Sequence, residues 1–66
     1  MNVLKLKGKM VEMEHSVEAL ALKLGIDNST FYRKMNRGGK FTIEEAQKIK
    51  DALSLSDEEV TAIFFG

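Results

Sequence analysis

The sequence predicts an all-α protein, one compact domain of five short helices that spans residues 1–66. Three observations predict this class. Apolar residues recur along the chain at the three- and four-residue spacing that places side chains on one face of a helix. Thr42 and Ser56 are each followed three residues later by a glutamate, which is the capping-box signature of a helix start. Proline is absent, which favours uninterrupted helices.

Length and composition limit the possible classes of protein. Sixty-six residues lie near the lower limit for an independently stable core, so tight packing or a dimer that adds buried area is expected. With no cysteine, neither a disulfide nor a thiolate metal site contributes to stability. The longest apolar runs, 20–22 and 62–65, are too short to span a bilayer, and no signal peptide is visible. We therefore expect a soluble, cytoplasmic protein with no membrane partner.

The first two helices are predicted from their apolar faces. Residues 2–13 place Leu6, Met10 and Met13 on a common face. Ser16 is a typical cap for the second helix, and Gly25 can adopt the left-handed conformation that closes it. The apolar stripe of this second helix consists of Val17, Leu20, Ala21 and Leu24. The small side chain of Ala21 allows another helix to cross closely over it.

The third helix, at about residues 28–36, completes a predicted helix-turn-helix over residues 16–36. Asp27, Asn28 or Ser29 can cap it, and we assign the cap to Asp27 because a carboxylate suits a helix amino terminus. Phe31 and Met35 are four residues apart and face inward together. Polar side chains occupy the other faces: Asn28, Ser29, Tyr32, Arg33 and Asn36. Tyr32 could instead pack against the second helix.

Two further helices follow the capping-box signatures. After Thr42, the expected apolar stripe consists of Ile43, Ala46, Ile49 and Leu53. After Ser56, the expected buried side consists of Val60, Ile63 and Phe64.

The formal net charge is zero, yet the charges are unevenly distributed. Residues 1–40 hold eight Lys and Arg against four Asp and Glu, whereas residues 41–66 hold two against six, giving plus four and minus four. Between Asn28 and Lys40 there are four basic residues and no acid, so the third helix and its exit form a basic patch. We expect the acidic helices to face away from an anionic partner, although Arg33 and Lys34 could equally be ordinary solvated surface.

These features resemble the lambda-repressor-like family of phage and prophage regulators, the Cro-like and repressor-like DNA-binding domains. The residues that carry the resemblance are Ser16, Leu20, Ala21, Leu24, Gly25, Ile26, Ser29, Thr30 and Phe31. The run Ser-Thr-Phe-x-Arg-Lys-Met at residues 29–35 is similar to small prophage proteins. The chain departs from the family at Val17, where a glutamine usually bonds a phosphate, and at Lys34, where the apolar residue is shifted to Met35.

The function expected from residues and resemblance together is sequence-specific recognition of double-stranded DNA by a transcriptional regulator. Its helix at about 28–36 would enter the major groove, where base edges display distinct donors and acceptors. The expected base-contacting residues are Asn28, Ser29, Tyr32 and Arg33. The expected phosphate-contacting residues are Ser16, Thr30, Lys34, Asn36, Arg37, Lys40 and Thr42.

The expected partners are a palindromic DNA operator and a second copy of the chain. Repressor-like domains commonly pair through their late helices, which suggests a homodimer interface at Ile63, Phe64 and Phe65. The alternative is a small protein-interaction module, an antirepressor or adaptor, that uses the same apolar surface. No catalytic pair, phosphate-cradling glycine motif or metal set is visible, so we expect no enzyme, no cofactor and no metal.

Overall fold

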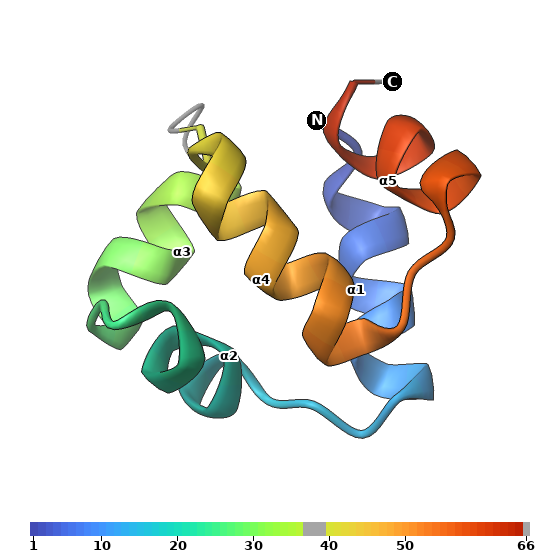
Figure 1. Cartoon of the computed structure of the whole chain (residues 1–66). Coiled ribbons are helices and arrows are strands. Elements are labelled where there is room, and N and C mark those ends of the chain that lie inside the picture. Colours follow the sequence, from blue (N-terminus) through green and yellow to red (C-terminus); the bar gives the residue numbers. More distant parts are fainter. Residues whose placement is uncertain (37–39, 66) are drawn as a thin grey trace.

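Each of the five predicted segments forms a helix in the computed structural model, which describes residues 1–36 and 40–65 (Figure 1). The helices are α1 (Val3–Glu12), α2 (Val17–Leu24), α3 (Asn28–Asn36), α4 (Ile43–Leu53) and α5 (Asp57–Phe64). The predicted all-α, five-helix architecture is confirmed. None of the helices within the described ranges has both the length and the apolar character needed to cross a membrane.

A side-chain oxygen caps the start of every helix. These caps are Asn2, Ser16, Asp27, Thr42 and Ser56. Both predicted capping boxes are present, with Glu45 and Glu59 returning a hydrogen bond to the cap residue. Asp27 is the cap of α3, because its Oδ1 accepts from the Thr30 amide at 2.7 Å. The local sequence therefore determines where each helix begins.

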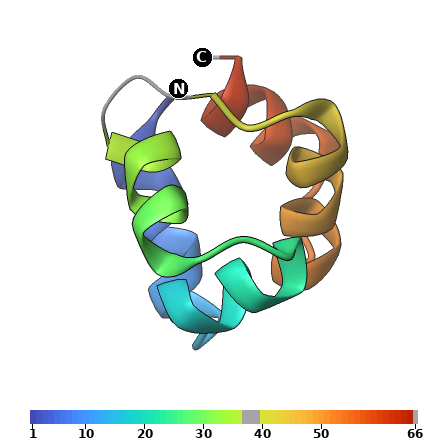
Figure 2. The same ribbon diagram turned by 90° about the vertical axis from the view of Figure 1, so that its left-hand side faces the viewer.

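The helices surround a core that their apolar side chains fill (Figure 2). The buried residues are Leu6, Met10, Leu20, Ala21, Leu24, Phe31, Met35, Ile49, Leu53, Leu55 and Ile63. An aromatic row extends from this core toward the surface: the Phe31 and Phe41 ring centroids lie 5.2 Å apart, and those of Phe41 and Phe64 lie 6.1 Å apart. Phe31 is thus held by aromatic packing as well as by the helices around it.

Two residues expected in the core lie outside it. Ile43 is 87% exposed, because it occupies the first position of α4, where Phe41 from the preceding segment turns inward instead. Met13 lies just past the end of α1 as its C-terminal cap and is partly exposed. Conversely, Leu55, in the short link between α4 and α5, is buried although the spacing did not predict it.

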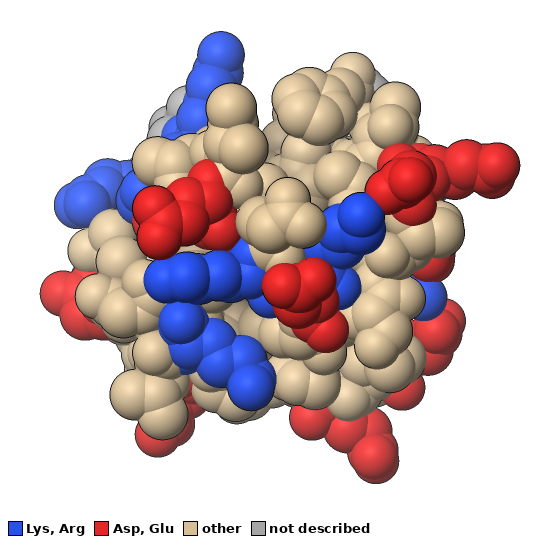
Figure 3. Space-filling model, in the orientation of Figure 1, with Lys and Arg blue, Asp and Glu red and all other residues tan. Residues whose placement is uncertain are grey.

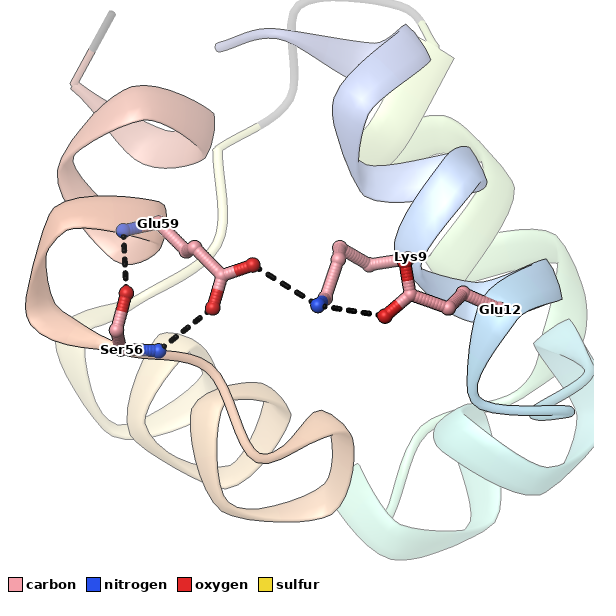
Figure 4. Close-up of polar contacts among 4 residues, drawn as sticks. All are labelled: Lys9, Glu12, Ser56 and Glu59. Atoms are coloured by element: carbon pink, nitrogen blue, oxygen red, sulfur yellow. Dashed lines mark hydrogen bonds and ion pairs between the residues drawn. The ribbon is translucent and has the colours of Figure 1, made fainter.

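Helices α1 and α5 pack together on the opposite side of the molecule from α3 (Figure 1). Lys9 of α1 points toward α5 and lies 2.8 Å from Glu59 and 3.0 Å from Glu12 (Figure 4). The Lys9 ammonium, together with the Ser56 amide, lowers the pKa of Glu59 to about 2. The Glu59 carboxylate therefore both caps α5 and binds that helix to α1.

Candidate nucleic-acid interface

The predicted helix-turn-helix is formed by α2, a short turn and α3. Gly25 is in the left-handed conformation, with φ of 74°. The amides of Gly25 and Ile26 donate to the carbonyls of Leu22 and Ala21 at 3.2 Å and 3.0 Å. These two bonds close α2 as a glycine C-cap does and turn the chain directly toward the start of α3.

Helix α3 has a buried face and an exposed face. Phe31 and Met35 are buried, and α3 packs closely against α2, where Ala21 is also buried. A large side chain at position 21 would separate the two helices. The inward anchors therefore fix which side of α3 is presented to solvent.

The four predicted base-contacting residues all lie on the exposed side of α3. Asn28, Ser29 and Arg33 are exposed, and Tyr32 is 49% exposed rather than packed away. Ser29, Tyr32, Arg33 and Asn36 line one shallow hollow, consistent with their i, i+3, i+4, i+7 spacing. None of these side chains makes a hydrogen bond or ion pair with another residue in 1–36 or 40–65.

Asp27 is not part of this exposed face, because its carboxylate caps the amino terminus of α3. The Thr30 hydroxyl and then the Thr30 amide hold the pKa of Asp27 below its ordinary value. The carboxylate is accordingly ionised near neutral pH, where its charge favours the amino terminus of α3. The only acid in the α2–α3 turn thus has a structural role.

The residues predicted to contact phosphates differ in their exposure and in whether their side chains already make hydrogen bonds. Asn36 and Lys40 are exposed, and Thr30 is half-buried. Ser16 and Thr42 are exposed, but their hydroxyl oxygens accept from the amides of Ala19 and Glu45, so only their hydroxyl protons remain to donate. Arg37 lies outside the described residues.

Lys34 differs most from its predicted role. Its Nζ contacts both carboxylate oxygens of Glu45, at 2.8 Å and 3.0 Å, instead of extending into solvent. Burial raises the pKa of Glu45, but the Lys34 ammonium and the Thr42 amide outweigh burial and hold that pKa below its ordinary value. Sequence spacing gives no signal for this pair, since eleven residues separate its members.

The predicted dimer residues also require a correction. Ile63 is 1% exposed and belongs to the protein's own core, because consecutive residues of α5 point in different directions. Phe64 is half-buried, whereas Phe65 is 77% exposed. Phe65 and Phe64 instead share one apolar groove with residues that were not predicted to belong to an interface, namely Met1, Phe41, Ile43 and Ala46. This end groove is lined by Met1, Lys40, Phe41, Ile43, Ala46, Phe64 and Phe65.

Charges of both signs meet on the molecular surface. Lys and Arg side chains lie beside Asp and Glu side chains across the middle of the face in Figure 3. One cause is that Glu45, from the acidic half of the chain, lies against Lys34 of α3. The two halves of the sequence therefore do not form two cleanly separated charged faces.

A scan of protein-family models, a search of curated proteins and a search of solved structures each give no match. Within the described part of the chain, no three His, Asp or Glu side chains gather as a metal site would require.

Proposed function

We propose that this chain is a sequence-specific, double-stranded DNA-binding transcriptional regulator that inserts α3 into the major groove. The observation that carries the proposal is the exposed polar face of α3, held outward by Phe31 and Met35 on its buried side. A helix of this diameter fits the groove, and side chains in its first turns reach base edges.

The chemistry of this face suits base recognition. The Asn28 amide can pair with adenine through two hydrogen bonds, and the Arg33 guanidinium can do so with guanine. Ser29 can donate or accept, and the Tyr32 ring can contact a thymine methyl group. Because these side chains have no hydrogen-bonding partner among the described residues, binding DNA would not require breaking contacts within the fold.

Backbone contacts would come from the edges of the same face. Lys40 and Asn36 are exposed near the end of α3, and the Ser16 hydroxyl can donate from the start of α2. Arg37, outside the described residues, stays a predicted contact. Such groups fix the register of the protein on the duplex and contribute little sequence information.

We propose that the regulator binds a palindromic operator as a homodimer, with two α3 helices about one helical turn of DNA apart. The end groove supports this, because its projecting side chains, Phe65 and Ile43, stand beside a hollow lined by Phe41 and Phe64. A two-fold contact uses the same patch on both copies, so one patch must supply both the projecting and the receiving parts. Its resemblance to repressor-like proteins further favours a phage or prophage regulator acting in the cytoplasm.

Selection of preferred duplexes from a random pool tests the proposal. A palindromic winner whose affinity falls steeply with added salt is expected, since phosphate contacts release counterions. Enrichment of no sequence, or an affinity that salt leaves unchanged, would contradict the proposal.

The second candidate function is a protein-interaction module, such as an antirepressor or adaptor. The exposed Ile43 and Phe65 favour it, because apolar side chains of this size are usually covered by a partner when they cluster. A Phe65→Ser/Ile43→Ser variant separates the two functions. A regulator would lose its dimer yet bind half-sites weakly, whereas an interaction module would lose its only partner and show no duplex preference.

A further inference from the structure

Within the described residues, the most buried ion pair lies directly behind the exposed face of α3. The Lys34 side chain is 22% exposed and that of Glu45 is 13% exposed, whereas the other ion pairs each have a carboxylate exposed by 38% or more. Lys34 sits between Arg33, which is exposed, and Met35, which is buried. The pair therefore joins the flank of α3 to the amino terminus of α4.

Both oxygens of the Glu45 carboxylate accept hydrogen bonds. Its Oε1 accepts from Lys34 Nζ at 2.8 Å and from the Thr42 amide at 2.8 Å, while its Oε2 accepts from Lys34 Nζ at 3.0 Å. The Glu45 backbone amide donates to Thr42 Oγ1 at 3.0 Å, which is the second hydrogen bond of the capping box. Since the capping box fixes the Glu45 side chain, Lys34 is held at a defined point on α4.

We propose that Lys34 and Glu45 form a brace that sets the orientation of α3, and that Lys34 is a positioning residue rather than a phosphate contact. This inference rests on the proposed DNA-binding function. Helix α3 packs mainly against α2 through its inward face, so the brace adds a second attachment, to α4. Two attachments on different sides resist rotation of the helix about its axis. Rotation would displace Tyr32 and Arg33 from the base edges that they read.

The two roles for Lys34 predict different responses to salt. A lysine that neutralises a phosphate contributes about one to the slope of log affinity against log salt concentration, for every duplex. A brace contributes nothing to that slope and acts on discrimination between duplexes, because orientation affects base contacts more than backbone contacts.

The experiment measures affinity for the selected duplex and for a scrambled duplex across a range of salt concentrations. The variants are Lys34→Met, Glu45→Gln and their combination; Glu45→Gln keeps an oxygen for the Thr42 amide, so the helix cap survives. Lys40→Met is the matched control for loss of a lysine; because Lys40 also lines the end groove, the oligomeric state of this variant is measured by sedimentation alongside its affinity. Glu44→Gln, on the exposed neighbour of Glu45, is the control for loss of a carboxylate.

We expect Lys34→Met and Glu45→Gln each to reduce discrimination between the two duplexes by several-fold with an unchanged salt slope. The combined variant should discriminate between the two duplexes as well as the single variant with the lower discrimination, because both substitutions break the same Lys34–Glu45 pair. Lys40→Met should lower the salt slope by about one and weaken binding to both duplexes by the same factor. A slope lowered by about one in Lys34→Met, with discrimination intact in Glu45→Gln, would overturn the brace.

Failure of the proposed function is distinguishable from failure of the brace. If the unmodified protein prefers no duplex, the proposed function is wrong. The brace is then tested by amide hydrogen exchange. Exchange over residues 32–36 should be faster in Lys34→Met and Glu45→Gln, which detach α3 from α4, but not in Glu44→Gln. Unchanged exchange in both brace variants would overturn it.

Discussion

Helices α3 and α5 are both short, capped and amphipathic, yet they use their polar side chains differently (Figure 1). In α5, Asp57 contacts Lys50 at 2.6 Å, Glu59 contacts Lys9 at 2.8 Å, and the Thr61 hydroxyl donates to the Asp57 carbonyl at 3.0 Å. On the exposed face of α3, no comparable contact to another described residue exists. Asp57, Glu59 and Thr61 of α5 make contacts within the fold, whereas the polar groups on the exposed face of α3 are available to a partner.

This comparison shows that a polar helix face is not by itself a binding site. Glu59 and Asp57 are as charged as Arg33, but their contacts are made within the molecule. What distinguishes α3 is the combination of unused polar groups outside with tightly packed anchors inside. Five predictions test this distinction.

The largest expected effect separates two neighbours on α3. Phe31→Ala should lower the free energy of unfolding by about 3 to 5 kcal/mol, because it removes a buried ring and leaves a cavity. Tyr32→Ala should change it by no more than about 0.5 kcal/mol, since the ring is half exposed. Chemical denaturation followed by circular dichroism measures both. Equal losses of stability would show that α3 has no distinct outer face.

The second effect concerns binding rather than stability. Arg33→Ala should weaken binding to the selected duplex by about 1 to 3 kcal/mol and relax its sequence preference, because a base contact is lost. Glu58→Ala, on the exposed surface of α5, is the matched control and should leave binding unchanged. Electrophoretic mobility titrations with selected and scrambled duplexes provide the readout. Unchanged affinity and preference in Arg33→Ala would refute this contact.

The turn before α3 should be sensitive to a single methyl group. Gly25→Ala should destabilise the fold by about 1 kcal/mol, since an alanine resists the left-handed conformation observed there. The added Cβ would meet no atom within 4 Å, so backbone strain alone accounts for the loss. An unchanged melting temperature would mean that the turn does not constrain α3.

The same substitution in α1 should have the opposite sign. Gly8 lies within a regular helix, and a Cβ there also meets nothing within 4 Å. Gly8→Ala should therefore stabilise the fold by about 0.5 to 1 kcal/mol, because alanine loses less conformational entropy on forming a helix. Thermal melts of both alanine variants, recorded in parallel, check this pair of predictions. Destabilisation by Gly8→Ala would reveal a contact at α1 that the fold does not account for.

The smallest effect is the pH dependence of the α1–α5 contact. The pKa of Glu59 is about 2 in the folded protein against an ordinary value of 4.5. Its contribution to stability is therefore present above pH 4.5 and is lost as the pH falls toward 2. The loss should be modest because the pair is partly exposed. In Glu59→Gln, the melting temperature should change less between pH 4.5 and pH 2 than it does in the unmodified protein. An equal change in both proteins would contradict the Glu59–Lys9 pair.

Local signals in the sequence predicted most of the fold. Ser16, Thr42 and Ser56 cap helices where expected, and Gly25 ends α2, because these effects involve residues only a few positions apart. The exposed face of α3 followed from the same periodicity. The exposure of Ile43 could not be predicted, since Phe41 takes its place in the core only once the chain has folded. The Lys34–Glu45 pair likewise joins residues that no periodic pattern connects.

The most direct measurement is an NMR titration of isotope-labelled protein with its selected duplex. If the outer face of α3 reads DNA, the largest shifts should fall on Asn28, Ser29, Tyr32, Arg33 and Asn36, with α5 residues such as Glu58 unaffected. Shifts concentrated around Ile43 and Phe65, or on α5, with α3 unperturbed, would contradict the DNA-reading role of this helix.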